Sequence, residues 1–310
     1  MASPGAAGAR SAYIGVACAL IGSIGFSGKT VIVKLAYQYD VDVMTLLALR
    51  MLFALPVFLA MAWWAGGGTT RMTRRDWRAI IGLGFIGYYL GSYLDFAGLQ
   101  YISAGLGRLI LYLYPTLVLL LSALFLKQPI HARHLVSLAL SYGGIALVFH
   151  HEVSIGENLP QMALGAVLVF AGAVTYAIYL IAGSRTVVRL GSMRFTAYAS
   201  ISATFFVLAH FMTTHGPARL TVAHEVYWLT LVMALFSTVL PLWLIAEGLK
   251  RIGANQVALV ACIGPLSTIL LAHVFLDEPV TAIQLAGAAL VLAGVMIISV
   301  KPQATTPGNQ

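Results

Sequence analysis

The sequence predicts an all-α membrane protein whose ten transmembrane helices form two inverted five-helix repeats. Three observations predict this fold: an apolar composition, a one-sided distribution of basic loop residues, and a repeat at an offset of 150 residues. Of the 310 residues, 60% are apolar and only 9% are charged, whereas soluble domains carry roughly 25% charged residues. So few charges could not cover the surface of a water-soluble globule, and we therefore expect the lipid bilayer to be the solvent.

Apolar windows of about 20 residues, enough to cross a hydrocarbon core about 30 Å thick, mark the helices. In a first repeat over 12–150 we expect helices near 12–34, 43–65, 78–99, 103–126 and 133–150. In a second repeat over 161–300 we expect them near 161–184, 194–214, 224–248, 253–276 and 280–300. The segments outside the repeats are a short N-terminal tail, 1–11, and a polar C-terminal tail, 301–310, that we expect to be disordered.

Basic residues in the connections test this helix count, because one missed helix would move every later loop to the other side. With the N-terminus in the cytoplasm, 13 of the 18 Lys and Arg residues fall on the cytoplasmic side. Only Lys34 and Arg219 fall in the opposite loops, as the positive-inside rule expects. We therefore predict a multi-pass protein of the bacterial inner (plasma) membrane with both termini in the cytoplasm. These loops also account for the net charge of +8, and no nucleic-acid partner is expected.

The repeat aligns prolines and glycines as well as apolar residues. Sliding the chain against itself sets GLQYISAGLGRLILYLYPTLVLLLSALFLKQPI beside GLKRIGANQVALVACIGPLSTILLAHVFLDEPV. Pro115 meets Pro265, and Gly144 meets Gly294. Because each repeat has an odd number of helices, the second must enter the membrane from the opposite side. Inverted repeats place a binding site near the midplane and expose it alternately by rocking, so the symmetry indicates transport.

Four charged residues fall within the predicted helices, in the outer third of the bilayer. They are Lys29, Arg50, Asp95 and Arg108. Each costs at least about 2.5 to 3.5 kcal/mol on insertion scales and is therefore a functional hypothesis. One interpretation is an outer gate or a site for a substrate carboxylate, with Asp95 paired to one of the cations. The other is a set of structural ion pairs or snorkelling side chains.

Aromatic and polar residues form stripes at helical spacing, which predicts the walls of a binding cavity. The stripes are Tyr88 with Ser92 and Asp95, Arg108 with Tyr112 and Pro115, and Gly172 with Tyr176 and Tyr179, the repeat counterparts of Gly22, Phe26 and Lys29. Such a mixture suits an amphipathic solute with a charged head. The alternative is that the tyrosines form hydrogen bonds between packed helices.

Two further residues are weaker candidates for substrate contact, and two prolines are candidates for hinges. His210 and Trp243 lie toward helix ends, where interfacial positions are common, and are weaker candidates for substrate contact. Pro115 and Pro265 each remove a backbone hydrogen bond in mid-helix, so they are either hinges of alternating access or static kinks.

Other classes of function lack their motifs. The sequence has no paired catalytic groups, so we expect no enzyme. The cysteines, Cys18 and Cys262, stand alone, so we expect no metal site and no cofactor. The absence of a Walker A pattern leaves a secondary carrier rather than an ATP-driven pump. A membrane protein without a transport role remains the less favoured alternative.

The residues also resemble a known family, the EamA-type branch of the drug/metabolite transporter superfamily. The resemblance rests on the stretch FSGKTVIVKLA, on Arg50, and on the doubled pattern of Gly-Leu, Ala, mid-helix Pro and Phe-Leu-x-x-Pro. It implies eight helices around a central cavity, with helices 5 and 10 peripheral, in a monomer or homodimer. Within the superfamily the chain is most similar to the YddG-type exporters of aromatic amino acids. The implied function is export of aromatic and other neutral amino acids; the alternative is a proton-coupled exporter of drugs or other metabolites.

Overall fold

The structure, a computed structural model, describes residues 4–66, 71–127, 129–154 and 158–299. Within these ranges every regular element is a helix. Eight helices are long and apolar enough to cross a membrane, and the described part of the chain ends with two shorter apolar helices, Ile263–Leu276 and Ala282–Ile297. The protein is an all-helical, multi-pass membrane protein. The expected C-terminal tail lies outside the described residues, and the first helix begins at Pro4, within the segment expected as an N-terminal tail.

The first repeat contains seven α-helical segments and one π-helical segment. In chain order they are α1 (Pro4–Tyr37), α2 (Val43–Gly66), α3 (Arg74–Leu83), η1 (Gly84–Leu90), α4 (Gly91–Gly98), α5 (Ala104–Leu111), α6 (Tyr114–Leu126) and α7 (Ala132–Ser154). The predicted third span is the run from α3 through η1 to α4, and the predicted fourth span is α5 followed by α6. The remaining spans are single helices.

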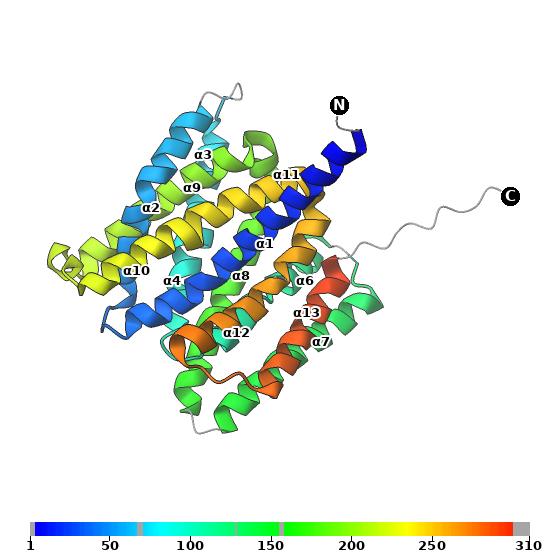
Figure 1. Cartoon of the computed structure of the whole chain (residues 1–310). Coiled ribbons are helices and arrows are strands. Elements are labelled where there is room, and N and C mark those ends of the chain that lie inside the picture. Colours follow the sequence, from blue (N-terminus) through cyan, green and yellow to red (C-terminus); the bar gives the residue numbers. More distant parts are fainter. Residues whose placement is uncertain (1–3, 67–70, 128, 155–157, 300–310) are drawn as a thin grey trace.

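The second repeat follows the same plan with one addition, a short 3-10 helix. Its elements are α8 (Leu159–Leu190), α9 (Ser192–Thr214), η2 (Pro217–Leu220), α10 (His224–Ala234), η3 (Leu235–Val239), α11 (Leu240–Ala261), α12 (Ile263–Leu276) and α13 (Ala282–Ser299). The structure differs from expectation in two places: α8 continues to Leu190, beyond the span predicted to end near 184, and α11 is helical through the residues predicted as the loop after 248. Arg251 there pairs with Glu247, one turn earlier, at 2.8 Å, and such pairs support helix. Figure 1 shows the chain reversing direction within α11.

The helical irregularities are themselves repeated. The two π-helical segments, η1 and η3, occupy corresponding places in the two repeats. The chain also breaks at Tyr112 and Leu113, between α5 and α6, and at Cys262, between α11 and α12. Pro115 is the second residue of α6 and Pro265 is the third residue of α12, so each lies in the first turn after its break. Because proline has no N–H to donate to the preceding turn, each break has a local cause in the sequence.

The helices α7 and α13 pack against each other at one edge of the molecule, as Figure 1 shows. Their crossing is close because glycines face each other: a Cβ at Gly144 would lie 2.6 Å from the carbonyl oxygen of Gly287. Ser137 Oγ donates a hydrogen bond of 2.5 Å to the carbonyl oxygen of Gly294, which is the repeat partner of Gly144. Helices 5 and 10 of the predicted count are therefore a symmetric pair beside the other helices.

Replacing Gly144 by alanine is expected to destabilise the protein, because the new methyl group would meet backbone rather than a movable side chain. Overpacking of this kind costs about 1–3 kcal/mol. The neighbouring Gly143 has nothing within 4 Å of its Cβ position, and alanine there is expected to be neutral or stabilising by up to about 1 kcal/mol. Thermal unfolding of both variants in the same detergent compares them, and equal midpoints would contradict this packing.

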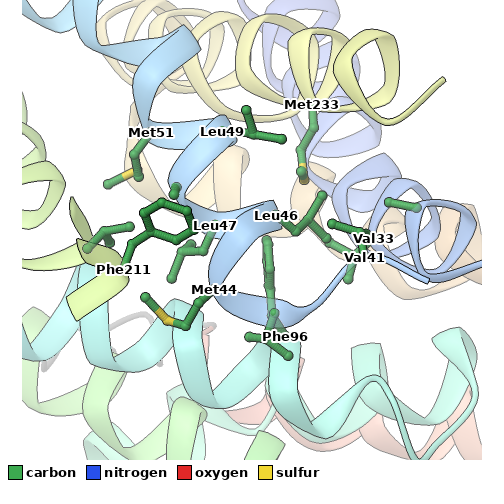
Figure 2. Packing of buried hydrophobic residues seen from close by; sticks show 14 of the residues in the cluster. Val33, Val41, Met44, Leu46, Leu47, Leu49, Met51, Phe96, Phe211 and Met233 are labelled. Carbon is green, nitrogen blue, oxygen red and sulfur yellow. The ribbon is translucent and has the colours of Figure 1, made fainter. Parts of the chain in front are cut away.

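The largest cluster of buried apolar residues surrounds the first half of α2. Leu46 and Leu47 are fully buried, and Phe96, Phe211 and Met233 pack in the same cluster from α4, α9 and α10. Figure 2 shows these side chains around the α2 ribbon. Because α2 is held on several sides at this level, the next turn of the helix is fixed in position. That turn carries Arg50.

Candidate functional site

A buried ion pair joins α1 to α4. Lys29 Nζ lies 2.7 Å from Asp95 Oδ2, and Asp95 is only 3% exposed. Arg50 and Arg108 are close enough for their charges to act on the Lys29 ammonium. The structure therefore brings together the four charged residues that the sequence placed at one depth.

Arg50 faces the same aromatic ring as Lys29. The guanidinium carbon of Arg50 lies 5.0 Å from the centroid of the Phe96 ring, and Lys29 Nζ lies 5.8 Å from it. One amino group of Arg50 donates a hydrogen bond of 3.1 Å to Ser92 Oγ. Its Nε is buried and has no acceptor among the described residues. A cation on an aromatic face gains about 2 kcal/mol when desolvated, which helps to hold Arg50 inside the protein.

Arg108 lies beside the two chain breaks. Its guanidinium carbon is 5.8 Å from the ring centroid of Tyr112, which stands at the first break. The hydroxyl of Tyr112 donates a hydrogen bond of 2.5 Å to the carbonyl oxygen of Ala261, at the second break. Gly264 leaves room for the guanidinium of Arg108, because a Cβ added at Gly264 would lie only 3.2 Å from Arg108 Nη2. Arg108 Nε is also buried without an acceptor in the described part of the chain.

The charges of this cluster do not cancel. Lys29, Arg50 and Arg108 contribute +3 and Asp95 contributes −1, which leaves +2. An uncompensated charge is costly at this depth of a membrane, and a buried guanidinium with a free N–H has the geometry to receive a planar anion. The cluster is therefore suited to bind a carboxylate.

A row of tyrosines continues from Tyr112 across α6 and α8 to η1. The ring centroids of successive members are 6.0 Å apart from Tyr112 to Tyr114, 5.2 Å from Tyr114 to Tyr176, 5.8 Å from Tyr176 to Tyr179, and 5.2 Å from Tyr179 to Tyr88. The hydroxyls of Tyr88 and Tyr179 are 3.2 Å apart. Tyr176 exposes 37% of its surface within this row, so the row offers an accessible aromatic face.

The sequence did not indicate Tyr114 as part of this row. In a regular helix, residues two apart point to nearly opposite sides, so Tyr112 and Tyr114 were not expected to meet. The break at Tyr112 and Leu113 changes this direction and brings the two rings together. The only signal in the sequence was Pro115, three residues after Tyr112. A proline does not indicate in which direction the chain will turn.

The other candidates lie apart from the row and the charges. His210 Nδ1 lies 2.7 Å from the hydroxyl of Tyr89, and its ring also contacts Tyr93. Trp243 is 54% exposed on α11 and Phe26 is half-buried on α1. Among the described residues, Trp243 and Phe26 have no ring contact with the row of tyrosines. Both remain candidates from the sequence without a geometric link to the site.

The helices that carry the site are joined across the two repeats at glycines. A Cβ at Gly98 on α4 would lie 2.6 Å from the carbonyl oxygen of Gly165 on α8. In the corresponding contact, a Cβ at Gly248 on α11 would lie 3.2 Å from the carbonyl oxygen of Gly15 on α1. Each helix pair therefore joins one repeat to the other, as do the hydrogen bonds of Tyr88 with Tyr179 and of Tyr112 with Ala261.

Comparison with known proteins agrees with this architecture. The EamA-like transporter family matches the chain twice, over residues 13–150 and 163–300. A relative from Bacillus subtilis, named uncharacterized transporter YcbK, is 30% identical over 288 residues, with 90% of each chain covered. Another from the same organism, uncharacterized transporter YetK, is 22% identical and covers 94% of this chain and 87% of its own.

A solved structure, titled only as the crystal structure of a protein, shares the fold. Its TM-score is 0.62 at 18% sequence identity, and the match covers 94% of this chain and 97% of the other. The family matches span both repeats, and the relatives named above are transporters by name. On the strength of both matches, this chain belongs to the EamA-like transporter family.

Proposed function

We propose that this transporter exports amino acids, with aromatic and other large neutral side chains preferred, as a secondary carrier. The observation that carries the proposal is the juxtaposition of a buried cluster of net charge +2 with a row of five tyrosines. Arg108 belongs to both, because its guanidinium lies over Tyr112. An amphipathic solute would place its carboxylate at the cations and its side chain along the tyrosine rings.

The carboxylate end of the substrate is assigned to Arg108 and Arg50. Each has a buried Nε without an acceptor in the described part of the chain. Lys29 is already paired with Asp95 at 2.7 Å. A charge-assisted hydrogen bond contributes about 1.5–3 kcal/mol, and a planar guanidinium receives both oxygens of a carboxylate. The same net charge disfavours cationic drugs as cargo, since they would be repelled.

The side chain of the substrate is assigned to the row of tyrosines. Aromatic pairs with centroids about 4.5–7 Å apart gain about 0.5–1.5 kcal/mol beyond simple burial. Tyr176 is 37% exposed, so part of its ring is open to contact with a further ring. We therefore expect phenylalanine, tyrosine and tryptophan to be preferred over small neutral amino acids.

Alternating access is assigned to the repeated irregularities. The π-helical segments and the breaks before Pro115 and Pro265 interrupt the regular α-helical pattern of backbone hydrogen bonds. They occur at corresponding places in both repeats. Rocking one repeat against the other about these points would turn the site from one membrane face to the other.

Counterflow of labelled phenylalanine in proteoliposomes tests the proposed function. The purified full-length protein is expected to exchange external label for internal unlabelled phenylalanine, above the rate of protein-free vesicles. An imposed proton gradient distinguishes facilitated from proton-coupled transport. Absence of counterflow with phenylalanine, tryptophan and leucine alike would overturn the assignment of amino acids as cargo.

Replacing Tyr176 by leucine is expected to lower counterflow of phenylalanine about tenfold while changing that of alanine little, because only the larger side chain reaches the aromatic row. One lost aromatic contact of about 1.4 kcal/mol corresponds to that factor. Replacing Tyr89 by leucine is the matched control, since Tyr89 contacts His210 and lies outside the row. Equal losses for both amino acids would contradict a role in side-chain selection.

A further inference from the structure

The break between α11 and α12 lacks a backbone donor. Pro265 has no N–H, so the carbonyl oxygen of Ala261, four residues earlier, loses the partner that a regular helix would give it. Inside a membrane another protein group must satisfy this oxygen, because lipid tails offer no donor. The hydroxyl of Tyr112 donates to it at 2.5 Å. A side chain of the first repeat therefore takes the place of the N–H that the second repeat lacks.

The two breaks differ in where their hydroxyl donors come from. At the first break, Thr116 Oγ1 donates a hydrogen bond of 2.7 Å to the carbonyl oxygen of Leu113, within the same turn. The repeat counterpart of Thr116 is Leu266, which has no hydroxyl. The second break instead receives the hydroxyl of Tyr112 from across the boundary between the repeats. A bond within one turn moves with that turn, whereas a bond between repeats must change when the repeats move against each other.

Tyr112 also contacts the charged end of the site. Its side chain is buried, and the guanidinium carbon of Arg108 lies 5.8 Å from its ring centroid. Gly264, the residue before Pro265, allows the approach of both side chains. A Cβ added at Gly264 would lie 3.2 Å from Arg108 Nη2 and 3.6 Å from Tyr112 Cε2. A movement of the second break therefore moves the surface against which Arg108 lies.

We propose that Tyr112 is a positioning residue whose hydroxyl holds the second break closed against Arg108, and that this hydrogen bond is released when the repeats rock apart. The ring of Tyr112 belongs to the aromatic row, and the hydroxyl has this separate role. The proposal rests on the proposed function in one respect, because transport is what requires the repeats to move. The hydrogen bond itself needs no cargo, so it is tested separately.

A double-mutant cycle of thermal unfolding with the purified full-length protein tests whether the hydroxyl replaces the missing N–H. Y112F removes only the hydroxyl and is expected to lower the unfolding midpoint by about 2 °C. P265A restores an N–H that is able to donate to the Ala261 carbonyl. In the P265A background, Y112F is therefore expected to leave the midpoint unchanged. Ser27 still donates to the carbonyl oxygen of Gly264 at 2.8 Å, so the single variant is expected to fold.

Y227F is the matched control for the cycle. The hydroxyl of Tyr227 also donates to a backbone carbonyl, that of Leu220 in η2, at 2.6 Å. Its loss is expected to lower the midpoint equally with and without P265A, because independent sites add. If Y112F also lowers the midpoint equally in both backgrounds, the Tyr112 hydroxyl does not stand in for the N–H of residue 265 and the proposal is overturned.

The kinetics of phenylalanine counterflow separate a positioning role from direct binding. Y112F keeps the ring and Arg108, so the half-saturating concentration is expected to stay within about twofold. The maximal rate is expected to fall about tenfold, the factor for one lost hydrogen bond, because each cycle must return to the closed break. A raised half-saturating concentration at an unchanged maximal rate would overturn the positioning role in favour of direct binding. If the wild type transports no phenylalanine, the proposed function fails, while the unfolding cycle still decides whether the hydroxyl closes the break.

Discussion

Replacing Arg108 by methionine is expected to reduce phenylalanine counterflow roughly 100-fold. The physical reason is the loss of the buried guanidinium that receives the substrate carboxylate, which costs about 3 kcal/mol. Methionine keeps a long apolar side chain beside Tyr112 and removes only the charge and the N–H donors. Initial rates in proteoliposomes measure the effect, and a single symmetric peak in size-exclusion chromatography shows that the variant is folded.

The matched control is Arg219→Met, in the exposed 3-10 helix η2. It removes the same charge from a predicted outer loop and is expected to leave counterflow unchanged. Benzoate binding to the purified protein should fall together with counterflow in the Arg108 variant. If Arg108→Met and Arg219→Met transport phenylalanine equally well, Arg108 is not the receiver of the carboxylate.

The membrane fold was predictable because its signals are long and redundant. About 20 apolar residues per span, one-sided basic loops and a gapless repeat all agree. Prolines could be aligned between the repeats, and both lie in the first helical turn after a break in the structure. The continuous α11 was not predicted, because Lys250 and Arg251 in a short polar stretch resemble a loop as much as a helix held by an ion pair.

The partners within the site could not be predicted from the sequence. Helical spacing put Tyr88, Ser92 and Asp95 on one stripe, yet Tyr88 meets Tyr179 on α8 while Asp95 meets Lys29 on α1. The π-helical segment η1 ends at Leu90, between Tyr88 and Ser92, and widens the turn there, so the stripe changes direction. No proline marks such a segment, and regular periodicity therefore fails at this point.

The sequence did not indicate the pocket lined by Lys34, Tyr37, Glu152 and Glu278, and the reason is different. Glu152 and Glu278 were recognised only as acidic residues of external loops, where most charges are solvated. Their shared attachment to the start of α5 depends on contacts between distant segments of both repeats. A single sequence carries no signal for which loop residues converge, so this part of the molecule required the three-dimensional structure.

Replacing Asp95 by asparagine is expected to destabilise the protein by about 3–5 kcal/mol, because the change leaves Lys29 buried without its counter-charge. The cluster would then hold three cations and no anion. Adding Lys29→Met to this variant is expected to recover most of the stability, since an apolar pair of similar size often replaces a buried ion pair without loss. Thermal unfolding of the two single variants and the double variant gives the coupling between the residues. Asp40→Asn is the control, because Asp40 is exposed at φ 54°, a conformation that asparagine tolerates.

Transport by the double variant separates the two interpretations of the charged cluster. Removing Lys29 and Asp95 together leaves Arg50 and Arg108, so the net charge stays at +2 and the carboxylate site is intact. Counterflow of phenylalanine is therefore expected to recover with stability, which would make the Lys29 and Asp95 pair a structural link between α1 and α4. A double variant that is as stable as the wild type but inactive would instead make this ion pair part of the outer gate, because its loss would then act on transport without acting on the fold.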